Sequence, residues 1–230
     1  MTSLHTALLH DICTLDGDHW ALATADISPL LDADTCRRAL SLVSPERRAK
    51  ALAISHARSR ALSVGAALLL DLLLIPHGHR ERQQHYLVGP HGKPALALLP
   101  QLHFSLSHTG TVAACAIARS PIGLDVQRPV AVSPAVVARV CSAEEQAALQ
   151  PLSDIHRRAA FARLWALKES WFKAVGTGIT DRYPAFHLPR SGAPRLLSPS
   201  APCTFHEFTH HDVPGALCLM TGENGNAAQL

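Results

Sequence analysis

Residues 161–176, FARLWALKESWFKAVG, form the stretch that decides the fold of the C-terminal half of the chain. Apolar side chains recur in it at helical spacing, and the pattern predicts a helix over residues 153–175. Gly176 follows directly, at the position where a left-handed residue commonly ends a helix. We therefore expect one long helix in this half.

One face of this helix carries a charged pair. Trp165, Glu169 and Lys173 lie four residues apart, so they form one stripe along the helix. A solvated ion pair beside a core tryptophan is one interpretation of the stripe. The alternative is a functional site, since apolar residues flank the pair on both sides. There the carboxylate would bind a hard cation and the ammonium would meet phosphate oxygens.

The segment 122–126, IGLDV, is typical of a short strand. Successive side chains of a strand point to opposite faces, so Ile122, Leu124 and Val126 should face the core. Asp125 and Gln127 should then share the other face. A strand-end acid that accepts a backbone hydrogen bond is the simpler interpretation. If the strand meets the helix, however, two carboxylates come together. Mg²⁺ is usually bound by one or two protein carboxylates, together with phosphates and water.

The remaining patterns alternate between helix and strand and predict an α+β fold. Ser44-Pro45-Glu46 begins a helix that runs toward Leu74, with a break near Ser55. Further expectations are a first strand and its exit within 20–31, strands at 86–88, 102–106, 111–118, 204–208 and 216–220, a turn at 107–110, a capping box at 142–145, a loop over 187–203 and an unstructured tail after Gly222.

Five motifs stand in one order along the chain, and together they resemble the 4′-phosphopantetheinyl transferase superfamily. The resemblance is to its larger single-chain type, the surfactin-synthetase-activating type, and it covers about residues 44–180. The motifs are Ser44-Pro45-Glu46-Arg47 with Lys50, Gly92-Lys93-Pro94, the run 104–110 (FSLSHTG), Gly123-Leu124-Asp125, and Trp165-x-x-Lys168-Glu169-Ser170-x-x-Lys173-x-x-Gly176.

The resemblance implies a fold of two similar α/β subdomains related by a pseudo-twofold axis. Residues 1–120 would form the subdomain with the basic helix and the nucleotide contacts. Residues 121–230 would form the subdomain with the metal-binding strand and the long helix. The active site would lie in the cleft between them.

The resemblance also implies a reaction. A serine of an apo acyl or peptidyl carrier protein attacks the β-phosphate of coenzyme A, takes the phosphopantetheine arm and releases 3′,5′-ADP, with Mg²⁺ as cofactor. Asp125 and Glu169 would bind the metal, and Glu169 is the candidate that accepts the serine proton, directly or through water. Lys173, together with Lys168, would neutralise the pyrophosphate. These residues make up the expected catalytic set.

Contacts to the nucleotide end of coenzyme A are implied in the N-terminal half. Arg47 and Lys50 would bind the 3′-phosphate, and Arg58 or Arg60 would join them, with the choice left open by the alignment. The other implied contacts are Lys93 with Pro94, which shapes its loop, and the pair Ser107 and His108.

One position departs from the family pattern. Many members carry an acid two residues after the strand aspartate, where this chain has Gln127. This departure leaves open an alternative function, a relative that binds coenzyme A or a carrier with weakened turnover. The sequence also leaves open whether the carrier serves fatty acid, polyketide or nonribosomal peptide synthesis.

Composition limits the remaining possibilities. A hydrophobic content of 47% predicts a globular protein, and a net charge of +3 is too small to indicate a nucleic-acid binder. The six cysteines form no C-x-x-C pair, which favours reduced thiols in a cytoplasm. The apolar run 61–75 is short and interrupted by Asp71, so we expect a buried helix and no membrane contact. We also expect a monomer.

Overall fold

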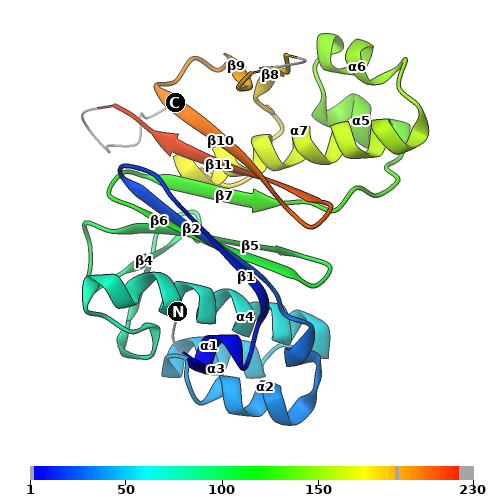
Figure 1. Ribbon diagram of the computed structural model, residues 1–230. Coiled ribbons are helices and arrows are strands. Elements are labelled where there is room, and N and C mark those ends of the chain that lie inside the picture. Colours follow the sequence, from blue (N-terminus) through cyan, green and yellow to red (C-terminus); the bar gives the residue numbers. More distant parts are fainter. Residues whose placement is uncertain (1–2, 190–191, 223–230) are drawn as a thin grey trace. The chain divides into compact units, whose positions relative to one another are not determined.

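The computed structural model describes residues 3–189 and 192–222. The chain divides into two compact units, Met1–Ser120 and Pro121–Leu230. Each unit combines helices with antiparallel strands, which confirms the predicted α+β class (Figure 1). The tail after Gly222, expected to be unstructured, lies outside the described residues. The two units are described one after the other.

The first unit is built on a four-stranded antiparallel sheet in the order β1-β2-β6-β5. Helix α4 (Ala57–Leu74) packs against this sheet, and its leucines and alanines contribute a large share of the core. Strand β6 is buried along its whole length; it pairs with β2 on one edge and β5 on the other, and α4 packs on it. The strands are β1 (His10–Asp16), β2 (Trp20–Asp26), β5 (His103–Thr109) and β6 (Val112–Ala118).

The helix expected from Ser44 toward Leu74 is broken where the sequence predicts it. Helix α3 (Pro45–Leu52) ends before Ile54, and α4 begins after His56, whose ring accepts a hydrogen bond from the Ser59 N–H. The Arg60 guanidinium donates to the Ile54 carbonyl at 2.8 Å. That bond satisfies a carbonyl in the break and fixes the turn between the two helices.

The apolar helix is a core element. Among the described residues, one helical stretch, Ala57–His77, is long and apolar enough to cross a membrane by those criteria alone. Within its most apolar window 72% of the residues are buried inside the unit, as in the core helix of a globular domain. Asp71, the acidic residue in this stretch, is buried and receives hydrogen bonds from Arg80 and from the Glu81 N–H.

Two details of the first unit differ from the sequence expectations. Strand β1 was not expected, and its residues are almost all exposed, so they show no apolar alternation. The turn expected at 107–110 is shorter, because Ser107 and His108 belong to β5 and pair with β6. The smaller elements are α1 (Ser3–Thr6), α2 (Ala33–Leu40), hairpin strands β3 (Tyr86–Val88) and β4 (Pro94–Leu96), and 3₁₀ turns at Ser28–Leu31, Ile75–His77 and Glu81–Gln83.

The second unit has a three-stranded antiparallel sheet in the order β10-β11-β7, with helix α7 (Asp154–Val175) packed on it. Gly176 caps the helix in a left-handed conformation with φ of 79°, as expected. The loop expected over 187–203 contains strand β9, which pairs with β8. The other elements are α5 (Pro134–Val140), α6 (Ala143–Leu149), β7 (Ile122–Val126), β8 (Ala185–His187), β9 (Arg195–Ser198), β10 (Cys203–His210) and β11 (Val213–Met220).

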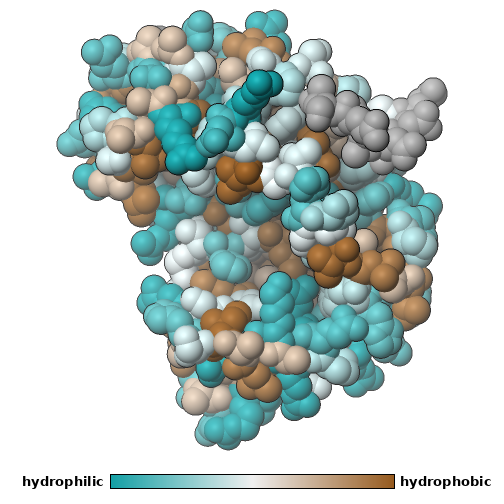
Figure 2. All heavy atoms as spheres, turned by 180° about the vertical axis from the view of Figure 1, so that it is seen from behind, coloured by the Kyte–Doolittle hydropathy of each residue, from teal (hydrophilic) through white to brown (hydrophobic). Residues whose placement is uncertain are grey.

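The exposed surface is mixed in character. Figure 2 shows one face, on which hydrophobic side chains form small separate groups among hydrophilic ones. Most of the exposed large apolar residues stand apart in the sequence, as Ile155 and Ile179 do, and scattered exposure of this kind is ordinary for globular proteins.

Candidate active site

Gly123 allows strand β7 to lie directly against helix α7. A Cβ atom at this position would stand 1.9 Å from the Ser170 carbonyl oxygen and 2.3 Å from the Ala174 nitrogen. Only glycine therefore fits at this contact. Because alternate residues of a strand share a face, Asp125 also points toward the helix, and the face that the sequence marked as polar is buried beneath α7.

The strand and the helix bring three charged side chains together. Lys173 Nζ donates to Asp125 Oδ1 at 2.7 Å and to the Leu124 carbonyl at 3.0 Å. Glu169 lies one helical turn before Lys173 and is only 8% exposed. Its Oε1 atom is buried and has no hydrogen-bond partner. The cluster therefore contains a buried carboxylate oxygen that no group within residues 3–189 and 192–222 satisfies.

The electrostatic balance of the cluster favours a bound cation. Burial raises the pKa of Glu169 above its ordinary value, the Asp125 carboxylate raises it further, and the Lys173 ammonium opposes both effects. Two acids that share one lysine leave the negative charge incompletely neutralised. A divalent cation would relieve both the desolvation of Glu169 and its repulsion by Asp125.

The residues present fit a magnesium ion. Among residues 3–189 and 192–222, no group of three or more histidine, cysteine, aspartate or glutamate side chains forms a metal site. Mg²⁺ does not need such a group, because it usually binds one or two carboxylates and completes its shell with phosphates and water. Asp125 and the unsatisfied oxygen of Glu169 supply that number of carboxylates.

Comparison with known proteins relates the second unit to a known family. Residues 121–218, which include all three members of this cluster, match the model of the 4′-phosphopantetheinyl transferase superfamily. This segment, somewhat less than half of the chain, is thus similar to that superfamily. The matched segment lies within the second unit, from its first strand to the buried part of β11.

Curated relatives of this superfamily align with both halves of the chain. The 4′-phosphopantetheinyl transferase Sfp of Bacillus subtilis is 28% identical over 144 residues, which are 62% of this chain and 64% of that protein. The transferase psf-1 of Bacillus pumilus is 29% identical over 193 residues, 78% of this chain and 81% of its own. HetI of Nostoc sp. is 29% identical over 160 residues. The alignment with Sfp thus spans less than two thirds of its length.

Lys168 lies in a different environment from its neighbour Glu169. Its Nζ atom donates to both carboxylate oxygens of Glu145, at 2.9 and 2.8 Å, and to the Pro184 carbonyl. The side chain is 1% exposed. Its three hydrogen bonds use the three donors of an ammonium group. The ammonium is thus enclosed and saturated, which argues against the phosphate contact expected for Lys168.

Glu145 is a functional position that sequence reasoning identified only in part. The predicted capping box is present, since Ser142 and Glu145 exchange hydrogen bonds at the start of α6. The same carboxylate also accepts from the Phe186 N–H and from Lys168. Glu145 thereby ties α6, β8 and α7 together. The motif indicated the cap, but nothing in it indicated the lysine 23 residues away.

Gln127 stands beyond the end of β7. Its backbone N–H donates to the Pro214 carbonyl at 3.0 Å, which continues the pairing of β7 with β11. Its side-chain amide donates to the Arg128 carbonyl at 3.4 Å, a weak bond. The amide is only half-buried, so its position is compatible with a small contribution to the site.

In the first unit, the expected nucleotide contacts differ in how accessible they are. Lys50 and Arg58 are exposed, whereas Arg47 is 9% exposed and lies over the Tyr86 ring, 4.9 Å from its centroid. Arg60 is engaged by the Ile54 carbonyl, with both Nε and Nη2 as donors. Of the two alternatives left open by the sequence, Arg58 is thus the accessible one.

The other expected contacts lie on neighbouring strands of the first unit. Lys93 and Pro94 are half-buried at the start of β4. Burial lowers the pKa of His103, and the positive charge of Lys93 lowers it further. On β5, Ser107 is buried and His108 is exposed. Strands β4 and β5 are in contact, so these four residues belong to one region.

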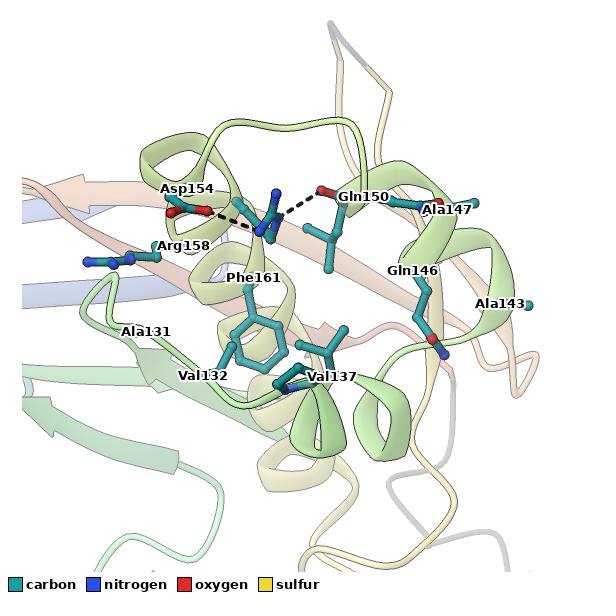
Figure 3. Close-up of a pocket in the computed structure, with 13 residues that line it drawn as sticks. Ala131, Val132, Val137, Ala143, Gln146, Ala147, Gln150, Asp154, Arg158 and Phe161 are labelled. Carbon is teal, nitrogen blue, oxygen red and sulfur yellow. Dashed lines mark hydrogen bonds and ion pairs between the residues drawn. The ribbon is translucent and has the colours of Figure 1, made fainter.

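A separate hollow of about 850 Å³ lies in the second unit among α5, α6 and the first half of α7 (Figure 3). Apolar side chains such as Val132, Val137 and Phe161 line it. At its rim, Arg157 donates to the Asp154 carboxylate at 3.1 Å and to the Leu149 carbonyl at 3.4 Å. None of the expected site residues lines this hollow.

Proposed function

We propose that this protein transfers the 4′-phosphopantetheine arm of coenzyme A to a serine of an apo acyl or peptidyl carrier protein, and so acts as a holo-carrier-protein synthase. The relatives that align with most of this chain are named 4′-phosphopantetheinyl transferases. The observation that carries the proposal is the cluster of Asp125, Glu169 and Lys173, with its unsatisfied Glu169 oxygen, inside the segment that matches the family.

Asp125 and Glu169 would hold Mg²⁺, which supplies positive charge to the pyrophosphate when it is bound. Lys173 keeps Asp125 in place and adds a second positive charge beside the carboxylates. Charge that develops on the transferred and the leaving phosphates during phosphoryl transfer is stabilised by such fixed cations. Lys173 therefore retains the role expected for it, and Lys168 is assigned to the support of α7 instead.

Glu169 is our candidate for the proton acceptor. The carrier serine must lose its hydroxyl proton as its oxygen forms a bond to the β-phosphorus and the bond to the ADP oxygen breaks. Burial raises the pKa of Glu169, and a carboxylate with a raised pKa is a stronger base than an ordinary one. The same carboxylate would then bind the metal and receive the proton, directly or through water.

The nucleotide end of coenzyme A would be held by residues of the first unit. Lys50 and Arg58 are exposed cations suited to the 3′-phosphate, and the buried Arg47 would add a third positive charge. Lys93, Pro94, Ser107 and His108 would contact the rest of the nucleotide. We further propose that the units are pseudo-twofold related, with coenzyme A between them. In support, each unit pairs a long helix with an antiparallel sheet. A cytoplasmic monomer without nucleic-acid or membrane contacts completes the proposal.

The direct test is a carrier panel. Purified protein is incubated with coenzyme A, Mg²⁺ and apo carriers from fatty acid, polyketide and nonribosomal peptide systems, and the carriers are weighed by mass spectrometry. We expect one phosphopantetheine group on at least one carrier and no reaction when Mg²⁺ is chelated. If no carrier gains mass while coenzyme A still binds, the alternative of a coenzyme A-binding relative with weakened turnover, which Gln127 favours, replaces this proposal.

A further inference from the structure

A fully buried carboxylate lies beneath the basic helix of the first unit. Glu81, in the 3₁₀ turn that precedes the β3–β4 hairpin, is 0% exposed. Its Oε2 atom accepts a hydrogen bond from the Ser44 N–H at 2.7 Å, and its Oε1 atom accepts one from the Ser44 hydroxyl at 3.0 Å. The Tyr86 hydroxyl donates a third bond to Oε1. One acid thus joins the beginning of α3 to strand β3.

These contacts control the first turn of α3. Ser44 is its N-cap, and its hydroxyl oxygen accepts a hydrogen bond from the Arg47 N–H at 3.3 Å. Glu81 fixes that hydroxyl by accepting a hydrogen bond from it, and it also accepts one from the Ser44 backbone N–H. The direction in which α3 leaves the cap, and hence the location of Lys50, depends on this arrangement.

The Arg47 side chain is held by the same group. Its Nε atom lies 3.9 Å from Glu81 Oε1, too far for a hydrogen bond, and has no hydrogen-bond partner. Its guanidinium lies over the Tyr86 ring, whose hydroxyl is bonded to Glu81. Burial, and next the Glu81 carboxylate, raise the pKa of Tyr86, so its hydroxyl remains a donor. Arg47 is therefore positioned by an acid and a ring that are themselves joined.

A second acid joins the same two elements from the solvent side. Glu46, in the first turn of α3, accepts hydrogen bonds from the Tyr86 N–H at 3.0 Å and from the His85 ring at 3.1 Å. The hairpin that begins at Tyr86 carries Lys93 and Pro94. The helix and the hairpin that bear the proposed nucleotide contacts are thus connected on both sides.

The 3₁₀ turn that carries Glu81 is also anchored to the core helix α4. The Glu81 N–H donates to Asp71 Oδ1 at 2.8 Å, and Asp71 also binds the Arg80 guanidinium and His5. The carboxylate of Glu81 is consequently held at a fixed point relative to α4. A serine cap needs no buried acid to form, so the acid adds something other than helix capping.

We infer that Glu81 is a positioning residue for coenzyme A, which sets the basic helix α3 and the Arg47 guanidinium against the β3–β4 hairpin so that the 3′-phosphate is recognised. The inference rests on the proposed function. Glu81 has no exposed surface and cannot touch a ligand, so it acts through Ser44, Arg47 and Tyr86. Its hydrogen bonds, more than its charge, would carry the effect.

The test is a calorimetric comparison of coenzyme A with 3′-dephospho-coenzyme A, which needs no carrier. In the wild type, coenzyme A should bind more tightly, and the ratio of the two dissociation constants measures recognition of the 3′-phosphate. Glu81→Ala should reduce this ratio by on the order of tenfold, which is the lower end of what loss of a hydrogen-bond partner behind a ligand costs at metal sites. Glu81→Gln should retain most of it, because the hydroxyls of Ser44 and Tyr86 can accept as well as donate.

Two further variants separate positioning from simple stability. Tyr86→Phe keeps the ring under Arg47 and removes one hydrogen bond to Glu81, so it should reduce the ratio less than Glu81→Ala but in the same direction. Leu69→Ala, a fully buried change in α4, should lower the unfolding midpoint and leave the ratio unchanged. If Glu81→Ala does not fold, the ratio in Tyr86→Phe decides.

The outcomes distinguish this inference from the proposed function. A wild type that modifies carriers, combined with Glu81→Ala and Tyr86→Phe variants that keep the wild-type ratio, overturns the inference alone. A ratio lowered equally by Leu69→Ala also overturns it, because the role would then be general stability. A wild type that binds both ligands equally overturns it together with the assignment of the 3′-phosphate contacts. Absence of any carrier modification affects the proposed function only.

Discussion

Lys168 and Glu169 are neighbours on α7, are both buried, and have opposite environments. The Lys168 ammonium makes three hydrogen bonds, two to Glu145 and one to the Pro184 carbonyl. Glu169 has a buried oxygen with no partner and stands beside a second acid, Asp125. One turn of helix thus carries a fully satisfied charge on one side and an unsatisfied one on the other.

The difference separates a charge that supports the fold from a charge that is suited to catalysis. A buried polar atom without a partner costs about 1–3 kcal/mol, so few survive in native proteins, and those that do need an explanation such as an absent ion or a catalytic role. Lys168 needs no such explanation, because its charge is neutralised within the protein. Glu169 does, and a cation with phosphate provides one. The two residues should therefore respond to mutation in opposite ways.

The largest effect on stability is expected at Lys168. Lys168→Ala leaves the Glu145 carboxylate buried without its partner, and breaking a buried ion pair typically costs about 3–5 kcal/mol. The free energy of unfolding, measured by urea denaturation, should fall by that amount. Lys173→Ala is the matched control, because the Lys173 side chain is one-third exposed and its loss should cost much less. A loss below about 1 kcal/mol for Lys168→Ala would contradict the assignment.

A satisfied acid in the first unit should behave like Lys168 and unlike Glu169. Burial alone would raise the pKa of Asp71, but hydrogen bonds from His5, Arg80 and the Glu81 N–H lower it from 3.8 to about 2. The group is charged in the folded state at lower pH than in the unfolded state. Its stabilisation is therefore present above pH 3.8 and is lost as the pH falls toward 2.

The measurement for Asp71 is the change in unfolding free energy across this pH range. The shift corresponds to roughly 2 kcal/mol, since each pKa unit is worth about 1.4 kcal/mol. Wild type should lose that much more stability between pH 5 and pH 2 than Asp71→Asn, which lacks the titrating group. Parallel curves for the two proteins would show that Asp71 does not hold the charge described here.

Glu169 should show the opposite sign. Its pKa is raised, mainly by burial, so its ionisation is harder in the folded state than in the unfolded state. The resulting penalty is absent below the ordinary pKa of a glutamate and present at neutral pH. Glu169→Gln should therefore raise the unfolding temperature at pH 7 in the absence of divalent ions, and the gain should vanish as the pH is lowered to 4. A destabilised Glu169→Gln protein would place this residue among the structural charges.

Gln127 should have the smallest effect. Its amide is neutral, half-exposed and weakly bonded to the Arg128 carbonyl, and water can replace a neutral ligand of Mg²⁺. Gln127→Ala should reduce turnover by less than about threefold, which is within the range of a weak hydrogen bond. Gln127→Glu should lower the Mg²⁺ concentration that gives half-maximal rate. Inactivity of Gln127→Ala comparable to loss of a carboxylate would place the amide inside the essential metal shell.

Local pattern predicted the elements of the site and could not predict their partners. The period of residues 153–175 and the cap at Gly176 gave the long helix, and the alternation around Asp125 gave the strand. Helical spacing states which residues share a face, but it does not state what lies opposite. Lys168 was therefore grouped with Lys173, although its partner Glu145 comes from a different helix.

The elements that the sequence missed have physical reasons of the same kind. Strand β1 is an edge strand with an irregular register between His10 and Cys13 and almost no buried side chain, so it shows no periodicity. Glu81 lies in a polar loop, and its importance comes from Ser44, 37 residues earlier. Contacts of this kind depend on the tertiary fold and have no local signature.

The most direct test of the central claim is turnover of Glu169→Gln and Asp125→Asn in a Mg²⁺ titration with an accepted carrier. Both changes preserve side-chain shape and remove one negative charge from the cluster. The account predicts folded proteins whose rates at saturating coenzyme A are lower by on the order of a hundredfold to a thousandfold, as for the loss of one electrostatic element of an active site. For Glu169→Gln, that loss should occur in a protein more stable than the wild type. A rate within about threefold of the wild type, with an unchanged Mg²⁺ dependence, would contradict the claim that these carboxylates hold the metal.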